Sequence, residues 1–196
     1  MVKTLYCIRH GTSEHNVRYK QVGHIAFHEK MDTKLVDSGI VESINLGITW
    51  DKRDHVELIV VSPLSRTLQT CFNIFKDTTT NIVVLDDLIE YPQHSEICNK
   101  RENKSVIEEL YPRFDFSQLP EDREWDSSKS ETYKELKDRC YGIKQWILNR
   151  PEKNICVVAH CSFLLAFMND NITKEQIEEI CENGIKHCLP YKMLLQ

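Results

Sequence analysis

The sequence predicts an α/β fold: a three-layer sandwich with a mostly parallel central sheet, flanked by helices and carrying a small cap over the carboxyl ends of the strands. Three observations lead to this class. Short apolar runs alternate along the chain with segments of helical periodicity. The runs lack polar alternation, which is typical of parallel strands buried on both faces. A segment over about residues 90–128 is broken by prolines, and it predicts the cap.

Four apolar runs are predicted to form the strands. They cover Thr4 to Ile8, Leu58 to Val61, Ile82 to Leu85 and Ile155 to Ala159. In an open parallel sheet, ligands bind beyond the carboxyl ends of the strands. The residues that follow each run are therefore the candidates for chemistry.

Helices are expected between the strands. The apolar spacing between residues 35 and 48 predicts a crossover helix with Asp37 or Ser38 as its N-cap. Ser65 to Phe75 and Tyr133 to Leu148 predict two further helices, each with one apolar face. Inside the cap we expect one short helix at most, around Ser105 to Leu110.

The composition favours one globular domain over residues 1–196. With 196 residues, 41% of them hydrophobic, the chain can bury one sizeable core but not two. A net charge of −5 argues against nucleic acid or an anionic membrane surface as a partner. The first apolar run meets Arg9 at once, so we expect neither a signal peptide nor a spanning helix, and a cytoplasmic location. The eight cysteines form no C-x-x-C pair, and reduced, mostly buried thiols are expected.

Groups that could hold an anion follow three of the predicted strands. Taken alone, each has an ordinary interpretation as the end of a strand, a surface charge or a hydrogen-bonded core histidine. Gathered in one crevice, they would repel each other unless an anion lay between them. The third strand is followed instead by carboxylates, among which Glu90 directly precedes the cap and is the first candidate for a proton donor. The cationic or imidazole groups are Arg9, His10, Arg66 and His160.

In this order, the segments resemble the motifs of the histidine phosphatase (phosphoglycerate mutase-like) superfamily. The resemblance also includes D-T-K-L-V-D-S-G at residues 32–39, before the first long helix. Each motif alone is weak evidence for the resemblance. Together, in the right order and at the expected strand ends, the motifs are strong evidence for it. The main matches are R-H-G-T-S-E-H-N at Arg9 to Asn16, S-P-L-S-R-T-L-Q-T at Ser62 to Thr70, L-I-E at Leu88 to Glu90 and V-V-A-H at Val157 to His160.

The resemblance implies a phosphohydrolase that needs no metal and no other cofactor. Its nucleophile would be His10, which would carry the phosphoryl group, and Glu90 would be the proton donor. Phosphoryl transfer depends on positioning and on neutralising negative charge, and guanidinium forks with a second imidazole supply both. The phosphate-binding residues that it implies are Arg9, Gly11, Asn16, Arg66, His160 and Cys161.

Two departures from the family pattern leave details open. Cys161 stands where the family usually has glycine after the second catalytic histidine. The residues after Glu90 do not match the motif of the glycolytic mutases, so Glu96 remains a second candidate for the proton donor. The remaining histidines are expected to be mostly exposed, and only His24 is expected near the substrate.

Three functions stay open at this level. The Gly-Trp and Arg-His-Tyr-Gly elements of the cofactor-dependent mutases are absent, which favours a phosphatase acting on a small phosphomonoester such as a sugar phosphate. A phosphoglycerate mutase is the first alternative, because the cap is partly basic. A non-catalytic module that binds a phospho-ligand or a protein is the second. An exposed sheet edge or the cap could also pair two copies into a homodimer. The basic cap residues are Lys100, Arg101, Lys104 and Arg113.

Overall fold

The computed structural model describes residues 2–121, 125–180 and 184–196. Its sheet has five strands in the order β3-β2-β4-β1-β5. The first four strands in this order are mutually parallel, and β5 runs antiparallel to β1 at the edge. The mostly parallel sheet is therefore confirmed. The strands are β1 (Lys3–Arg9), β2 (Leu58–Val61), β3 (Asn81–Val84), β4 (Asn154–Ala159) and β5 (Pro190–Leu195).

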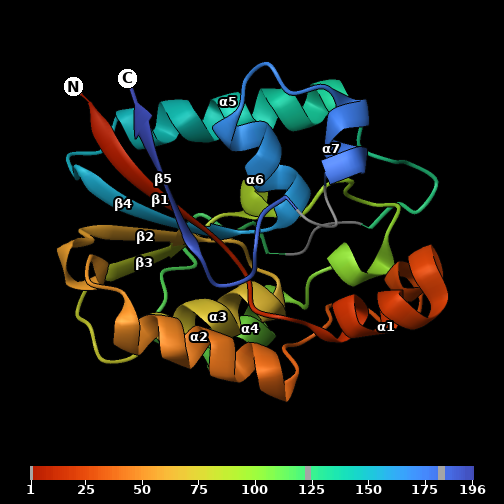
Figure 1. Ribbon diagram of the computed structural model, residues 1–196, viewed down its shortest axis with the longest axis horizontal. Coiled ribbons are helices and arrows are strands. Elements are labelled where there is room, and N and C mark those ends of the chain that lie inside the picture. Colours follow the sequence, from red (N-terminus) through yellow and green to blue (C-terminus); the bar gives the residue numbers. More distant parts are fainter. Residues whose placement is uncertain (1, 122–124, 181–183) are drawn as a thin grey trace.

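Helices cover both faces of the sheet and complete the three layers (Figure 1). On one face lie α2 (Asp37–Thr49), α3 (Ser65–Phe75) and α4 (Lys104–Leu110). On the other lie α5 (Tyr133–Leu148), α6 (Cys161–Met168) and α7 (Lys174–Ile180). The first helix, α1 (Glu14–Val22), follows β1 beyond its carboxyl end. The predicted helices correspond to α2, α3, α4 and α5, so these four predictions are confirmed. The predicted N-cap of α2 is wrong, because Val36 occupies that position and Asp37 is already the first helical residue.

Side chains that alternate along the central strands pack into two hydrophobic cores, one on each face of the sheet. Val60 and Val157 pack with α5 and α6, whereas their neighbours Ile59 and Val158 pack with α3. All four side chains are completely buried. Full burial of such a side chain contributes about 1.5–3 kcal/mol, so both faces of the central strands stabilise the sheet. This two-sided burial explains why the strand sequences show no polar alternation.

The predicted cap divides into two parts. Its first part carries Cys98 and Asn99 to the carboxyl ends of the strands, as expected. Its second part instead extends the sheet: the Asp115 N–H donates to the Ile82 carbonyl at 2.7 Å, and the Val84 N–H donates to the Asp115 carbonyl at 2.9 Å. This second part thus covers the edge of β3. Residues 122–124, also within the predicted cap, lie outside the described residues.

Two further expectations concern membranes and thiols. No described helix combines the length and apolar character that crossing a membrane requires. The cysteines within the described ranges have free thiols, and all of them except the half-buried Cys188 are buried. Cys181 lies outside the described residues.

Candidate active site

Neighbouring strands bring His10, Arg66 and His160 together. β4 lies between β1 and β2 in the sheet, so the three carboxyl ends are adjacent. His10 follows β1 and His160 follows β4, and their ring centroids are 5.2 Å apart. Arg66 stands in the first turn of α3, just after β2. All three side chains are buried, so their charges and ring nitrogens act on each other without bulk water between them.

His10 is held in one tautomer by the backbone. Its Nδ1 lies 2.7 Å from the Gly11 carbonyl oxygen, and a carbonyl only accepts, so Nδ1 carries the proton. The Nε2 atom is left with its lone pair. Burial, and then the positive charge of Arg66, hold the pKa of His10 well below 6.5. His10 is thus an uncharged imidazole with one nitrogen fixed and the other available for bonding.

His160 is oriented by two partners. Arg66 Nε donates to His160 Nδ1 at 3.3 Å, which leaves the proton on Nε2. That Nε2 then donates to Ser62 Oγ at 2.8 Å. Burial and the charge of Arg66 lower the pKa of His160 well below 6.5, so this imidazole is neutral as well.

The guanidinium group of Arg66 is fixed by the cap and by the start of its own helix. Its two terminal nitrogens donate to the Cys98 carbonyl and to Asn99 Oδ1, both at 2.8 Å. Asp32 accepts hydrogen bonds from the Ser65 N–H at 2.7 Å and the Ser65 hydroxyl at 2.8 Å. A carboxylate at this position caps the first turn of α3. The cap and the loop before α2 therefore set the position of Arg66 from two sides.

Arg9 combines a paired nitrogen with an unpaired one. One terminal nitrogen donates to the Ile185 carbonyl at 2.9 Å. The Arg9 Nε atom is buried, and within the described part of the chain it has no hydrogen-bond partner. Buried donors are nearly always paired in native proteins, so an unpaired one marks a place where an acceptor belongs.

Residues 185–188 hold the carboxyl end of β1 through two hydrogen bonds. The Cys188 N–H donates to the Arg9 carbonyl at 3.0 Å, and His187 Nδ1 donates to the His10 carbonyl at 2.6 Å. The His187 ring lies 5.4 Å from the His10 ring. Burial, followed by the charge of Arg9, lowers the pKa of His187 to about 4. The sequence prediction missed this residue, since no spacing in the chain links it to His10.

Gly11 and Asn16, which the family resemblance assigns to phosphate binding, are engaged by protein groups in this structure. The Gly11 N–H donates to Thr70 Oγ1 at 3.0 Å, and a Cβ on Gly11 would lie 2.5 Å from the Gly39 carbonyl oxygen. Gly11 is thus required by its close approach to α2. Asn16 Oδ1 accepts from the Ser13 N–H at 3.1 Å and the Ser13 hydroxyl at 2.7 Å, which stabilises the start of α1.

The positions of His15 and His24 can be compared with the sequence predictions for the remaining histidines. His15 is buried rather than exposed, because its Nδ1 lies 2.6 Å from Thr33 Oγ1 and its ring packs 6.0 Å from that of His10. His24 is exposed and packs against Tyr19 and Phe27 of its own region. His15 therefore packs beside His10, whereas no contact among the described residues joins His24 to His10, Arg66 or His160.

The charges of two carboxyl groups, Glu90 and Glu96, act on Arg66. Glu90 accepts three backbone hydrogen bonds, from Tyr91 at 2.9 Å, Phe163 at 2.9 Å and Ser162 at 3.2 Å. It therefore caps α6, whose first residue is the buried Cys161. Glu96 accepts from Asn99 Nδ2 at 3.1 Å. Burial, and then the charge of Glu90, raise the pKa of Glu96 to about 7.

These groups suit an anion better than a cation. Arg9 and Arg66 supply positive charge, and the imidazoles of His10 and His160 are neutral. Within the described residues, no group of three or more His, Cys, Asp or Glu side chains is arranged to hold a metal ion. The arrangement can therefore bind a phosphate between guanidinium groups and present it to His10 Nε2.

Comparisons with known proteins agree with the motifs. The model of the histidine phosphatase superfamily (branch 1) matches residues 5–188. Phosphoglycerate mutase-like protein 1 of Arabidopsis thaliana is 28% identical over 200 residues, which cover 85% of this chain and 71% of that protein. A probable phosphatase of Schizosaccharomyces pombe is 26% identical over 166 residues, or 81% of this chain and 74% of its own. Mycobacterial hydrolase 1 has a similar fold, with a TM-score of 0.65, 18% identity, and coverage of 99% of this chain and 91% of its own. The chain belongs to the histidine phosphatase superfamily, branch 1.

Proposed function

We propose that this protein hydrolyses a small phosphomonoester through a phosphohistidine on His10. The observation that carries the proposal is the state of His10, which is buried, neutral and fixed through Nδ1, with Nε2 unprotonated next to Arg66. A nucleophile needs such a lone pair at neutral pH. The Arg9 Nε atom, which has no hydrogen-bond partner within the described ranges, supports the proposal, because a phosphate oxygen would provide an acceptor for it.

The reaction would proceed in two displacements. His10 Nε2 forms a bond to phosphorus as the bond to the ester oxygen breaks, and that oxygen leaves with a proton from a carboxyl group. Water then attacks the phosphohistidine, the N–P bond breaks, and the carboxylate takes up a proton from the water. Arg9 and Arg66 neutralise the charge on the phosphoryl oxygens in both steps. The products are an alcohol and inorganic phosphate.

We propose Glu90 as the proton donor, because it occupies the acid/base position that the family motif implies. Glu96 is the second candidate, since its pKa of about 7 lets it hold or release a proton at neutral pH. Substrates with different leaving groups distinguish the two candidates for the proton donor. A true proton donor matters most for a poorly leaving alkyl alcohol, so its Gln variant should lose far more activity on glycerol 1-phosphate than on p-nitrophenyl phosphate.

The mutase alternative depended on a basic cap, and the structure weakens that argument. Arg101 is paired with Asp86, and Lys104 with Glu121. Arg113 donates to the carbonyls of Phe75 and Lys76 at the end of α3. Most of the basic charge of the cap is therefore already bound within the protein, which favours hydrolysis over retention of a bisphosphorylated intermediate.

The test is phosphate release from a panel of phosphomonoesters in excess chelator. The panel includes 3-phosphoglycerate and is run on the wild type, on His10→Ala and on the matched control His24→Ala, which removes an exposed histidine. We expect turnover and an acid-labile phosphoenzyme in the wild type and in His24→Ala, and neither in His10→Ala. Isomerised phosphoglycerate would support the mutase. Equal inactivity of all three proteins, with no trapped phosphoenzyme, would support a binding module instead.

A further inference from the structure

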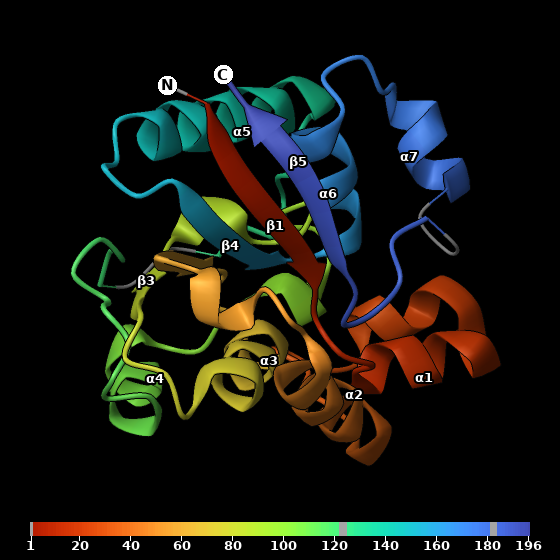
Figure 2. The same cartoon turned by 60° about the vertical axis from the view of Figure 1, so that its left-hand side comes forward.

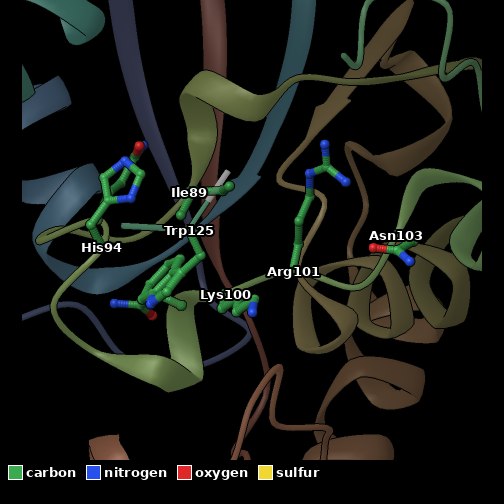
Figure 3. Close-up of a pocket in the computed structure, with 8 residues that line it drawn as sticks. Ile89, His94, Lys100, Arg101, Asn103 and Trp125 are labelled. Atoms are coloured by element: carbon green, nitrogen blue, oxygen red, sulfur yellow. The ribbon is translucent and has the colours of Figure 1, made fainter. Parts of the chain in front are cut away.

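The segment that carries Glu90 borders a cavity of about 50 Å³ in the cap (Figure 3). Ile89, which precedes Glu90 in the chain, and Gln93, which follows it, both line this cavity. A segment beside a cavity is restrained less by side-chain packing than a segment inside a filled core. The position of the Glu90 backbone therefore relies more on hydrogen bonds to the residues around it.

Arg139 of α5 holds the chain just before Glu90. Its Nη1 atom donates to the Ile89 carbonyl at 2.6 Å and to the Asp87 carbonyl at 2.8 Å. The same guanidinium group lies over the Phe163 ring, 5.0 Å from the ring centroid. The Phe163 N–H in turn donates to Glu90 Oε1 at 2.9 Å. Arg139 thus contacts both the backbone that leads into Glu90 and a residue that binds the Glu90 carboxylate.

Glu131 holds the chain just after Glu90, and it forms an ion pair with Arg139. Its carboxylate accepts from Arg139 Nε at 2.5 Å and from Arg139 Nη2 at 2.9 Å. Glu131 also accepts from the Gln93 N–H and donates its own N–H to the Gln93 carbonyl, both at 3.1 Å. One ion pair therefore binds the backbone on both sides of Glu90, at Ile89 and at Gln93.

The ion pair is well suited to fixing a position. The Arg139 and Glu131 side chains are only 9% and 6% exposed, so water competes little for their hydrogen bonds. The nitrogens of a guanidinium group donate in fixed directions, which an ammonium group cannot reproduce. Because the Glu131 carboxylate neutralises the Arg139 charge, we expect the pair to act on Glu90 through geometry and not through charge.

We propose that the Arg139–Glu131 ion pair positions Glu90 for proton transfer to the leaving group. Both are positioning residues, since they act on the reaction through Glu90. This inference rests on the proposed function, in which the Glu90 carboxyl gives its proton to the ester oxygen as the bond from that oxygen to phosphorus breaks. Such a donor must lie within hydrogen-bond reach of the oxygen, and a misplacement of about 1 Å can lower the rate about 100-fold.

The test compares two esters. The phenolate of p-nitrophenyl phosphate leaves without help, whereas the alkoxide of glycerol 1-phosphate needs a proton. The measured quantity is kcat/KM for p-nitrophenyl phosphate divided by kcat/KM for glycerol 1-phosphate, named here the leaving-group ratio. Loss of proton donation raises this ratio, and Glu90→Gln, which removes the donor itself, should raise it by about 100-fold.

Variants of the ion pair should reproduce part of this effect. Arg139→Met removes every hydrogen bond of the guanidinium group and should raise the leaving-group ratio by about tenfold. Arg139→Lys keeps the charge but cannot bind Glu131 and both carbonyls at once, so it should raise the ratio nearly as much. Glu131→Gln keeps one oxygen acceptor and should raise the ratio by a smaller factor.

Lys144→Met is the matched control. Lys144 is another cation of α5 with a side chain that is 10% exposed, and it pairs with Asp170 at 2.6 Å. Its ammonium group lies 5.5 Å from the centroid of the Phe167 ring. Within the described part of the chain, its side-chain hydrogen bond goes to Asp170 and not to residues 86–93. Lys144→Met should therefore keep the wild-type leaving-group ratio, and thermal unfolding verifies that each variant is folded.

A double variant distinguishes positioning from a general loosening of the structure. If Arg139 acts through Glu90, Arg139→Met cannot raise the ratio further once the Glu90 carboxyl is gone. The variant that combines Glu90→Gln with Arg139→Met should then have the same leaving-group ratio as Glu90→Gln alone. A general loosening would instead lower kcat/KM for both esters alike and leave the ratio unchanged.

The outcomes separate the positioning role from the chemistry. A wild-type ratio in folded Arg139→Met, or a further rise in the double variant, overturns the positioning role and leaves the proposed function standing. If Arg139→Met does not fold, Arg139→Lys and Glu131→Gln decide the same question. A wild-type ratio in Glu90→Gln overturns Glu90 as the proton donor and the positioning role with it. A wild type that hydrolyses neither ester, and forms no phosphoenzyme, overturns the proposed function as a whole.

Discussion

Replacing Glu96 by glutamine is expected to stabilise the protein above neutral pH. Burial and the neighbouring Glu90 charge raise the pKa of Glu96 from 4.5 to about 7 in the folded protein. Between these two values the unfolded chain has released the Glu96 proton and the folded protein still holds it. The free energy of unfolding therefore falls as pH rises from 4.5, and the loss is complete above pH 7.

The size of the loss follows from the two pKa values. Each pKa unit corresponds to about 1.4 kcal/mol, so the rise from 4.5 to about 7 amounts to about 3 kcal/mol at pH 8. At pH 5 the same relation leaves less than about 1 kcal/mol. Glu96→Gln cannot ionise and keeps a similar volume. The difference in the free energy of unfolding between Glu96→Gln and the wild type should thus grow by about 2 kcal/mol between pH 5 and pH 8, in favour of the variant.

Urea unfolding at the two pH values measures this difference directly. Glu109→Gln is the matched control, because Glu109 lies exposed on α4 and should show no such pH-dependent gain. If Glu96→Gln gained the same stability at pH 5 and pH 8, or lost stability at pH 8, the assignment of a raised pKa to Glu96 would be refuted. The role of Glu96 as a proton carrier would then lose its physical basis.

Three further predictions concern the packing and positioning of the site. Gly39→Ala should destabilise the protein by about 3 kcal/mol in urea unfolding, because its Cβ would lie 2.0 Å from the Thr12 carbonyl oxygen. Gly142→Ala is the control, because the space around Gly142 is open, and it should be neutral or stabilising. Equal effects of the two substitutions on stability would contradict this reasoning. Arg66→Lys should lower kcat/KM by about 100-fold while unfolding remains cooperative, since an ammonium cannot replace the fixed guanidinium fork; a loss under about threefold would count against it. His187→Phe should lower kcat by about tenfold through loss of the hydrogen bond to the His10 carbonyl, and His187→Asn should recover part of it; indistinguishable variants would indicate a purely structural residue.

The strands that flank the site could be predicted because they are buried on both faces. Leu58 to Val61 reads as an unbroken apolar run for that reason. β5 was not predicted, because it is an edge strand in which Lys192 and Leu194 are exposed while Leu195 is buried. α1 was missed for a related reason, since His15 is its one buried residue and no apolar stripe marks it. Edge and surface elements owe their structure to contacts that local sequence does not encode.

The same distinction holds within the candidate site. His10 and His160 were predicted as neighbours because each follows a buried strand, and the order of parallel strands brings such ends together. His187 could not be predicted, because its bond to the His10 carbonyl joins residues 177 positions apart. That bond depends on the antiparallel pairing of β5 with β1, which was itself unforeseen. Likewise, only the three-dimensional structure shows that the Gln93 Nε2 atom has no hydrogen-bond partner among the described residues.

The position of β1 in the sheet determines when the catalytic centre can form during synthesis. β1 is made early, yet its partners are the last two strands of the sheet: Thr4 pairs with Asn154, and Lys3 pairs with Leu195 (Figure 2). Pairings this distant in sequence form slowly, since a long loop must close before they stabilise the chain. In a ribosome-bound chain whose β4 has not yet been synthesised, His10, the proposed nucleophile, therefore follows an unpaired strand, and under the proposed function such a chain would be inactive.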